Sequence, residues 1–401
     1  MARGQRIVDL RDETEEMIEP DPRGAGSGRI LIADDQADVL AALQLLLKGE
    51  GYETRSAQTP EQVLEIMQSD RPELLLMDLN YARDTTSGHD GLGLLRSIRA
   101  LDHDLPVIVL TGWASLDVAV ECLRRGVSDF IQKPWDNTKL LAALRKHLGE
   151  SRRLRESRRR EAELAQQIEE AEGIQRGLLP MISSVPGCRI AVSWKPSGSL
   201  SGDYFDVLRF DPSRFGICIA DVVGKGVPAA LLMSNFQAMV KSIARGSESP
   251  GELCERLNSF VCGAVSSNRF ITFFYALMDM EKRTLHFANA GHNPPILARR
   301  DGSWMRLSEG GTVLGVLSDR RYSQGEIDLS PGDRMLFYTD GFSEARNADG
   351  EEFGEGRLIE MILGHPQLDP QELKERILLS VTEFTGGSLH DDSTLIALRV
   401  D

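Results

Sequence analysis

Between Arg29 and about His147, short apolar segments alternate with amphipathic ones, and this alternation constrains the fold more than any other feature of the chain. The apolar runs at 29–33, 73–79, 106–112 and 129–134 are typical of strands, and the segments at 39–50, 91–100 and 116–125 have helical spacing. Strands that alternate with helices form a parallel sheet with helices on both faces. The sequence therefore predicts an α/β domain over residues 28–147, with a doubly wound five-stranded parallel sheet.

Polar residues stand where these strands end, and the carboxyl ends of parallel strands meet at one edge of a sheet. They are Asp34, Asp35, Asp78, Thr111 and Lys133. Carboxylates suit Mg²⁺, while a hydroxyl and an ammonium bind phosphoryl oxygens. We therefore expect Asp78 to accept a phosphoryl group, the acids after the first strand to hold the metal, and the hydroxyl and ammonium to neutralise the added charge. Helix capping explains any one of these residues but not the whole set.

The pieces "ADD", "LLLMDL", "DGLGLL", "PVIVLTG" and "DFIQKPW" resemble the CheY-like receiver domain of response regulators. The resemblance implies phosphorylation of Asp78 by a sensor histidine kinase and an aromatic switch at Phe130. It also implies that Asp35, Asp78 and the backbone carbonyl of Asn80 bind Mg²⁺.

The segment "NYARDTTSGHDG" after Asp78 is longer than the usual turn of that family. Its residues Asp84 and His89 either change the phosphate lifetime or partner contacts, or belong to a tolerated loop insertion. The insertion is the favoured interpretation, because surface loops accept extra residues readily.

The stretch from Thr138 to Leu179 contains no proline, and apolar residues recur in it at three- and four-residue spacing. The members of this stripe are Leu141, Leu144, Leu148, Leu164, Ile168, Ala171, Gln175 and Leu178. We expect a coiled-coil-like helical linker over residues 148–181 that forms a homodimer. The arginine-rich run "RRLRESRRR" within it is interpreted as a solvated or intramolecularly paired face rather than a nucleic-acid site.

Residues 182–401 combine long alternating strand patterns with amphipathic helices, which predicts an α+β sandwich. Four acids from distant segments stand at predicted strand ends or turns: Asp203, Asp221, Asp340 and Asp391. Such a set, without histidines or thiols beside it, suits two hard divalent cations such as Mn²⁺ or Mg²⁺. Two bridged ions activate a water and bind a phosphate for in-line attack. Each acid taken alone is equally well a turn residue.

The same region resembles the metal-dependent PPM protein phosphatases, specifically the bacterial SpoIIE/RsbU class. The blocks that carry the resemblance are "IQRGLLP", "SGDYFDV", "ADVVGKGVPAALLMS", "ANAGHNPPIL", "VLGV", "YTDGFSEARNADGEEFGEGRL" and "DDSTLIALRV". The resemblance implies that Asp221 bridges the two metals and that Asp203 completes one of them with the carbonyl of Val222. Asp340 and Asp391 would complete the other.

The family resemblance implies hydrolysis of phosphoserine or phosphothreonine on a STAS-domain anti-sigma factor antagonist, which would control release of a sigma factor. The whole chain is then a response regulator whose receiver controls a phosphatase, although the sequence does not give the sign of that control. The alternative is a catalytically silent adaptor that binds sigma-factor regulators. All four metal acids are kept, which favours the enzyme.

Other residues near these blocks receive supporting roles. Asp392 stands where the family often has Asn, and we expect it to lie behind the ligands. Lys195 is the nearest cation to the first acid and a weak candidate for gripping phosphate. We interpret "AGHNPP", with His292 and Asn293, as a turn that supports the site.

Composition limits the remaining classes. With 41% hydrophobic and 27% charged residues the chain is globular, and its formal charge of −15 argues against direct nucleic-acid binding. No apolar run is long enough for a membrane span, and the first residues have no signal-peptide pattern, so a cytoplasmic protein is expected. The five cysteines are interpreted as reduced core residues, and residues 1–27 as a disordered leader.

Overall fold

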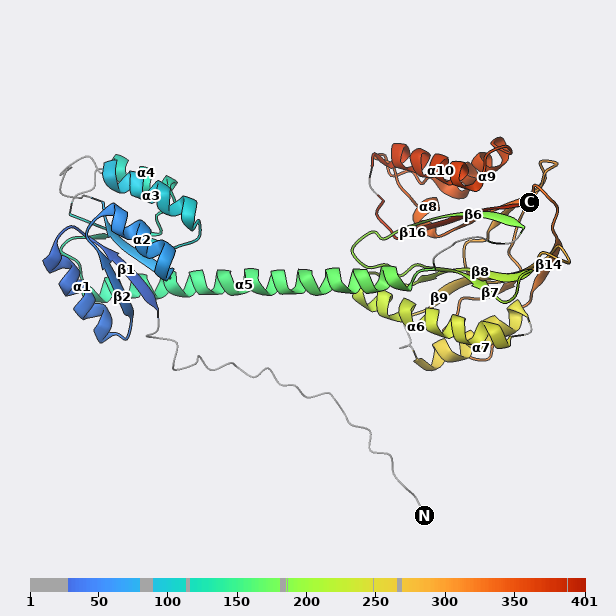
Figure 1. Ribbon diagram of the computed structural model, residues 1–401, viewed down its shortest axis with the longest axis horizontal. Coiled ribbons are helices and arrows are strands. Elements are labelled where there is room, and N and C mark those ends of the chain that lie inside the picture. Colours follow the sequence, from blue (N-terminus) through green and yellow to red (C-terminus); the bar gives the residue numbers. More distant parts are fainter. Residues whose placement is uncertain are drawn as a thin grey trace, which may run out of the picture. The chain divides into compact units, whose positions relative to one another are not determined.

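The computed structural model describes residues 28–79, 89–112, 116–180, 185, 187–247, 249–264, 269–387 and 389–401. The leader predicted at 1–27 lies outside these residues. The chain divides into two compact units, Met1–Glu163 and Leu164–Asp401 (Figure 1), and the division falls inside one long helix. No helix in the described residues combines the length and the apolar character needed to cross a bilayer.

The first unit contains a parallel sheet of five strands in the order β2-β1-β3-β4-β5, as predicted. Its strands are β1 (Arg29–Ala33), β2 (Glu53–Ala57), β3 (Leu74–Asp78), β4 (Val107–Thr111) and β5 (Asp129–Gln132), and its helices before the long one are α1 (Ala37–Gly49), α2 (Pro60–Asp70), α3 (His89–Leu101) and α4 (Leu116–Arg124). Apolar clusters lie on both faces of the sheet, which makes the fold doubly wound.

The edge strand β2 and the helix α2 were not singled out in the sequence. The strand reads ETRSA, and only its last residue is buried. A polar edge strand carries little of the apolar signal from which strands are recognised.

The long helix α5 runs from Asn137 to Leu178, in agreement with the proline-free stretch. Leu140, Leu144 and Leu148 on its first turns pack into the core of the first unit. Farther along, large apolar side chains are exposed at Leu154, Leu164, Ile174 and Leu178. Gln175, which the spacing placed in the same apolar stripe, is instead buried within the second unit.

Arginines of the basic run pair with acids of the chain itself. Three of them, at intervals of three residues, face the first unit: Arg152 binds Glu73 at 2.8 Å, Arg155 binds Asp102 at 3.1 Å, and Arg158 binds Asp104. Two more, Arg159 and Arg160, pair with glutamates one helical turn away. The interpretation as an intramolecularly paired face is confirmed for these residues.

The second unit is a sandwich of two sheets with helices on both outer faces, which confirms the predicted α+β architecture (Figure 1). One sheet has the order β13-β10-β9-β8-β7, with β14 also paired to β10, and the other has the order β12-β11-β15-β16-β6. The first sheet is built from β7 (Tyr204–Arg209), β8 (Arg214–Val222), β9 (Ile271–Asp279), β10 (Thr284–Ala290), β13 (Gly310–Gly311) and β14 (Gly325–Asp328). The second is built from β6 (Cys188–Lys195), β11 (Ile296–Ala298), β12 (Trp304–Arg306), β15 (Arg334–Tyr338) and β16 (Ser393–Val400).

Three apolar layers hold this unit together. The helices α6 (Val227–Ile243) and α7 (Pro250–Ala264) pack on the first sheet, and α9 (Gly354–Gly364) and α10 (Pro370–Thr385) pack on the second. A third cluster fills the space between the sheets. A 3-10 turn (Ala244–Gly246) follows α6, and the short α8 (Asp340–Ser343) follows β15.

All five cysteines are free, and all but Cys262 are buried, as expected for reduced core residues.

Candidate active site and phosphoacceptor pocket

The strand-end acids of the first unit come together at the carboxyl edge of its sheet. Ligand atoms of Asp34, Asp35 and Asp78 all lie within 4.8 Å of one another. The Lys133 ammonium donates to Asp34 Oδ2 at 2.6 Å and to Asp78 Oδ2 at 2.7 Å. Burial raises the pKa of Asp34 although the Lys133 hydrogen bond opposes this shift. The pocket therefore joins three oxygen ligands suited to a hard cation with one cation from the chain.

The remaining receiver candidates lie on neighbouring strands. Thr111 ends β4 and is buried, and its Oγ1 has no hydrogen-bond partner among the described residues, as expected of a donor that awaits a ligand oxygen. Phe130 on β5 is partly buried and packs against the core. Asn80, Asp84 and the side chain of His89 fall outside the described residues.

In the second unit the four predicted acids come from both sheets. Asp203 directly precedes β7, and Asp221 lies in β8. Asp340 opens α8 two residues after the end of β15, and Asp391 stands two residues before β16. Among the described residues, only the receiver acids form a group of three with ligand atoms mutually within 4.8 Å. The acids of the second unit are thus more widely spaced than a single-ion site requires.

The charges of these acids act on one another. Burial, and then the charges of Asp340 and Asp391, raise the pKa of Asp221 to about 7. Burial and the charge of Asp221 raise the pKa of Asp203 well above its ordinary value. The pKa of Asp340 is raised by burial and by Asp391 and Glu344. Buried carboxylates that repel one another are the environment in which a bound cation is most favourable.

Asp203 provides the most direct test of whether a metal fits. Its Oδ2 accepts hydrogen bonds from Thr339 Oγ1 at 2.8 Å and from Thr394 Oγ1 at 2.7 Å. Its Oδ1 is buried and has no hydrogen-bond partner among the described residues. A buried carboxylate oxygen without a partner is costly, and a cation removes that cost. The donor set therefore fits a divalent ion.

Two glycines allow the segments that carry the acids to lie close to one another. A Cβ on Gly202 would lie 3.0 Å from the carbonyl oxygen of Val222, and a Cβ on Gly341 would lie 2.0 Å from that of Asp392. The loop before Asp203 therefore lies against the end of β8, and the turn that carries Asp340 lies against the segment before β16. Glycine is needed at position 341 for this contact, and at position 202 a Cβ would be a tight fit.

Asp392 links two loops of the site. Its Oδ1 accepts hydrogen bonds from the backbone N–H and the hydroxyl of Ser197, at 2.7 and 2.9 Å. Its Oδ2 accepts from the Gly202 N–H at 2.7 Å. Both oxygens are therefore engaged in positioning the segment before Asp203, in keeping with a supporting role.

The turn that contains His292 contacts the segment of Asp221 through Thr272. The Nδ1 atom of His292 lies 2.7 Å from Thr272 Oγ1, and that hydroxyl donates to the carbonyl of Asp221 at 3.5 Å. Burial lowers the pKa of His292 to about 3, so the ring is neutral near pH 7. Asn293 donates to Ser343 Oγ at 3.3 Å.

Sequence reasoning missed four residues of the site. Lys225 lies among the acids, with its ammonium 3.0 Å from Asp391 Oδ1, whereas the candidate Lys195 is exposed at the end of β6. Thr339 and Thr394 orient Asp203, and each stands within three residues of a predicted acid in "YTDG" or "DDST". Gln175 on α5 is buried and binds the backbone of Ser201, beside Asp203.

Comparison with known proteins gives a family for each unit. Residues 30–145 match the response regulator receiver domain, and residues 211–401 match stage II sporulation protein E (SpoIIE). The phosphoserine phosphatase RsbU of Bacillus subtilis is 34% identical over 239 residues, which are 59% of this chain and 71% of RsbU. The chain covers only 41% and 53% of the lengths of two further curated relatives.

Each unit has relatives of its own. The transcriptional regulatory protein ZraR of Escherichia coli is 36% identical over 119 residues, which are 30% of this chain and 26% of ZraR. The structure of the SiaA-PP2C domain of Pseudomonas aeruginosa superposes with a TM-score of 0.54 at 25% identity and covers 60% of this chain and 98% of that domain.

The fold and these matches define a protein with a response regulator receiver domain and a PPM-type phosphatase domain. The chain belongs to the SpoIIE/RsbU family of protein serine/threonine phosphatases, which are metal-dependent, and it carries a response regulator receiver domain on the amino-terminal side.

Proposed function

We propose that this chain is a response regulator that removes phosphate from phosphoserine or phosphothreonine on a STAS-domain anti-sigma factor antagonist. The freed antagonist would then capture its anti-sigma factor and release the sigma factor. The observation that carries the enzymatic part is Asp203: one of its oxygens is fixed by two threonines, and the other is buried without a partner among the described residues. This arrangement supports a metal-bound enzyme over a silent adaptor.

The chain's acids would hold two divalent ions, Mn²⁺ or Mg²⁺. We assign Asp221 to bridge them, Asp203 and the Val222 carbonyl to one ion, and Asp340 and Asp391 to the other. When bound, such ions supply an activated water and neutralise the phosphoryl oxygens. The threonines hold Asp203 in place, and Asp392 fixes the loop before it.

Lys225 is the residue that we assign to the substrate phosphate. Its ammonium lies 3.0 Å from Asp391 Oδ1 and also donates to the His390 carbonyl at 3.0 Å. With more than half of its side chain exposed, Lys225 can turn toward a bound anion while the metal ligands stay in place. An ammonium at this position would attract and orient the phosphate.

The receiver domain would be phosphorylated on Asp78 by a sensor histidine kinase, with Mg²⁺ held by Asp35, Asp78 and Asn80. Lys133 and Thr111 would bind the phosphoryl oxygens, and Phe130 would respond to the change. This chemistry belongs in the cytoplasm, where the kinase and the sigma factor are found.

The helix α5 would carry the state of the receiver to the phosphatase. Gln175 near its end donates to the Ser201 carbonyl at 2.8 Å and accepts from the Ser201 N–H at 3.0 Å. Ser201 Oγ in turn accepts from the Asp203 N–H at 3.0 Å. A shift or rotation of α5 would therefore move the backbone that presents the metal ligand.

The exposed apolar residues of α5 would pair with those of a second copy. Leu164, Ile174 and Leu178 are exposed by 57%, 69% and 37%. Large apolar side chains on an isolated helix favour a coiled coil, because pairing removes them from water. We therefore propose a homodimer through the linker, and light scattering of the wild type beside a Leu164→Glu, Ile174→Glu double variant would test it.

The direct test of the proposed function is release of phosphate from candidate phosphorylated STAS proteins in the presence of Mn²⁺ or Mg²⁺. We expect turnover by the wild type and none by Asp221→Asn. A metal-loaded wild type that binds the STAS proteins without releasing phosphate would establish the adaptor instead. The same assay gives the direction of control when the wild type with beryllofluoride bound to its receiver is compared with Asp78→Asn. Equal phosphatase rates and equal oligomeric states of these two proteins would refute the coupling.

A further inference from the structure

An unusual row of arginines crosses the second sheet at the end remote from the acids. Arg334 on β15 is the direct cross-strand neighbour of Arg399 on β16, and Arg399 is that of Arg189 on β6. Like charges directly opposite one another destabilise a sheet. Three in a row therefore require a compensating interaction.

The rest of the same sheet face shows that the position is exceptional. Two residues along each strand, on the same face, the corresponding row is Leu336, Ala397 and Ala191, and the first two of these belong to the apolar cluster under α9 and α10. The face is thus an apolar core layer that ends abruptly in three guanidinium groups. Simple solubility does not explain this, because Arg334 is only 4% exposed.

These arginines line a pocket of about 640 Å³, and Arg300 contributes a fourth guanidinium from the segment after β11. The other walls come from Pro331, Gly332, Pro366, Gln367, Val400 and Asp401. The volume is in the range of small-molecule sites. The chain as a whole has a formal charge of −15, so this is a local positive site on an acidic protein.

The protein itself neutralises little of this charge. Arg189 pairs with Asp401 at 3.0 Å, and among the described residues the other three arginines have no ion-pair partner. Arg334 donates to the Ile362 carbonyl, and Arg399 donates to the Gln367 carbonyl at 3.5 Å. Burial and the charge of Arg399 lower the pKa of Arg334. Most of the guanidinium donors of Arg189, Arg300 and Arg399 therefore remain available to a ligand.

We propose that this arginine pocket binds a small anion that carries two or more linked phosphate groups. Guanidinium groups bind phosphate oxygens in a bidentate geometry. The row extends over two strand spacings, about 9 to 10 Å, which is longer than one phosphate can bridge but within reach of linked phosphates.

The pocket is separate from the proposed active site. Asp391 and Arg399 stand at opposite ends of β16, and a strand of this length separates them by roughly 25 Å. The ligand would therefore act as an effector and not as a substrate. The proposal does not depend on the phosphatase activity.

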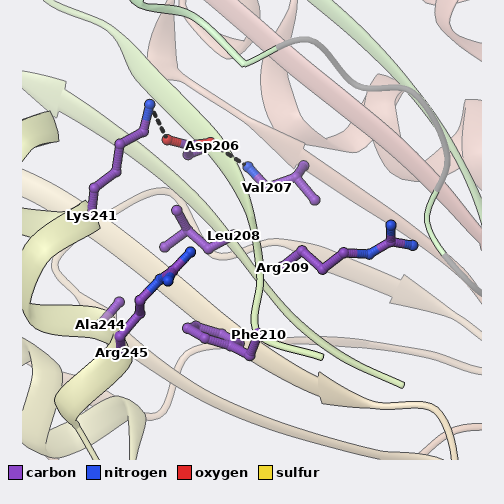
Figure 2. A pocket seen from close by; sticks show the side chains of 8 residues that line it. All are labelled: Asp206, Val207, Leu208, Arg209, Phe210, Lys241, Ala244 and Arg245. Carbon is purple, nitrogen blue, oxygen red and sulfur yellow. Dashed lines mark hydrogen bonds and ion pairs between the residues drawn. The ribbon is translucent and has the colours of Figure 1, made fainter. Parts of the chain in front are cut away.

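A second basic pocket of about 450 Å³ offers matched controls, because it also contains exposed arginines. It is lined by Arg209 on β7, by Lys241 near the end of α6 and by Arg245 in the 3-10 turn that follows (Figure 2). Figure 2 shows the Lys241 ammonium directed at the carboxylate of Asp206, and the two groups are 3.3 Å apart. These cations do not form a cross-strand row, so we expect no binding of linked phosphates there.

Occupancy of the pocket can be measured by modifying the arginines of the full-length protein with phenylglyoxal and following the reaction by peptide mass spectrometry. With pyrophosphate at about ten times its Kd, modification of Arg189, Arg300 and Arg399 should slow about tenfold, because only about a tenth of the pocket is then free. Arg209 and Arg245 should react at an unchanged rate. Asp221→Asn should show the same protection, which excludes an effect of pyrophosphate at the acids.

Equal protection of the control arginines, or none at all, would overturn the proposal. So would protection by polyglutamate without protection by pyrophosphate, since the pocket would then be a docking site for an acidic segment.

Thermal unfolding of Arg399→Gln gives an independent test. Without anion, removal of one like charge should raise the Tm by about 1 to 4 °C. Pyrophosphate should raise the Tm of the wild type and of Arg209→Gln but not that of Arg399→Gln. The assignment would be contradicted if Arg399→Gln were less stable than the wild type without anion and were still stabilised by pyrophosphate.

Discussion

Gln175, on the last turns of α5, exchanges two hydrogen bonds with the backbone of Ser201, at 2.8 and 3.0 Å. Both residues are buried, and Ser201 is two residues before the metal-ligand candidate Asp203. The contact gives the linker helix a fixed attachment to the loop that presents this carboxylate.

Replacing Gln175 by alanine should weaken the response to the receiver. The ratio of phosphatase rates with and without beryllofluoride on Asp78 should fall toward one, because the helix no longer holds the Ser201 backbone. Loss of two buried hydrogen bonds should also cost about 1 to 3 kcal/mol of stability. Arg176→Ala is the control, since the ion pair of Arg176 in the described part of the chain is with Glu172 on the same helix. An unchanged ratio in Gln175→Ala would remove this residue from the coupling.

Replacing Thr394 by valine should lower metal affinity. The hydroxyl donates to Asp203 Oδ2 at 2.7 Å, and valine keeps its shape but removes the donor. Loss of a group that orients a ligand typically weakens metal binding about 10- to 100-fold. The measurement is the Mn²⁺ concentration for half-maximal activity, together with calorimetric titration of Mn²⁺. Thr382→Val on α10, where the hydroxyl donates to the Leu378 carbonyl of the same helix, should bind Mn²⁺ like the wild type.

Replacing Lys225 by glutamine should impair turnover of the phosphorylated substrate about 10- to 100-fold in kcat/KM, as expected for a charged hydrogen bond to the phosphate. Lys195→Gln is the matched control, because Lys195 is exposed at the end of β6. Should the Lys195 variant be the impaired one, the phosphate would be held from the other side of the site. Equal kcat/KM in all three proteins would show that neither lysine contacts the phosphate.

His292 should make the second unit less stable in acid. Burial holds its folded-state pKa at about 3, below the ordinary value of 6.5. Between these two values the unfolded chain binds one more proton than the folded chain, so this contribution to stability is complete above pH 6.5 and is lost as the pH falls toward 3. In urea unfolding from pH 7 to 4.5, His292→Gln should show a pH slope smaller by up to one proton. Identical slopes would mean that the folded chain admits the charged imidazole.

Local pattern was enough to predict the receiver pocket. Asp34 follows a buried parallel strand, Asp78 and Thr111 each end one, and strands of one parallel sheet end at one edge. The sandwich and the acids of the second unit were likewise visible, because strand alternation and family blocks are local features. The polar strand β2 was not, because it has almost no buried face.

The parts that only the folded chain decides are contacts between distant residues. Thr339 and Thr394 reach Asp203 across 136 and 191 positions of sequence, and Lys225 reaches His390 across 165. The arginine row depends on the register of β15, β16 and β6, and this register cannot be predicted from the sequence of any one strand. Residue type and spacing determine which side chains can bind a cation or an anion. Strand register and the packing of two sheets determine which of them meet, because those distances are set by the whole fold rather than by any one segment.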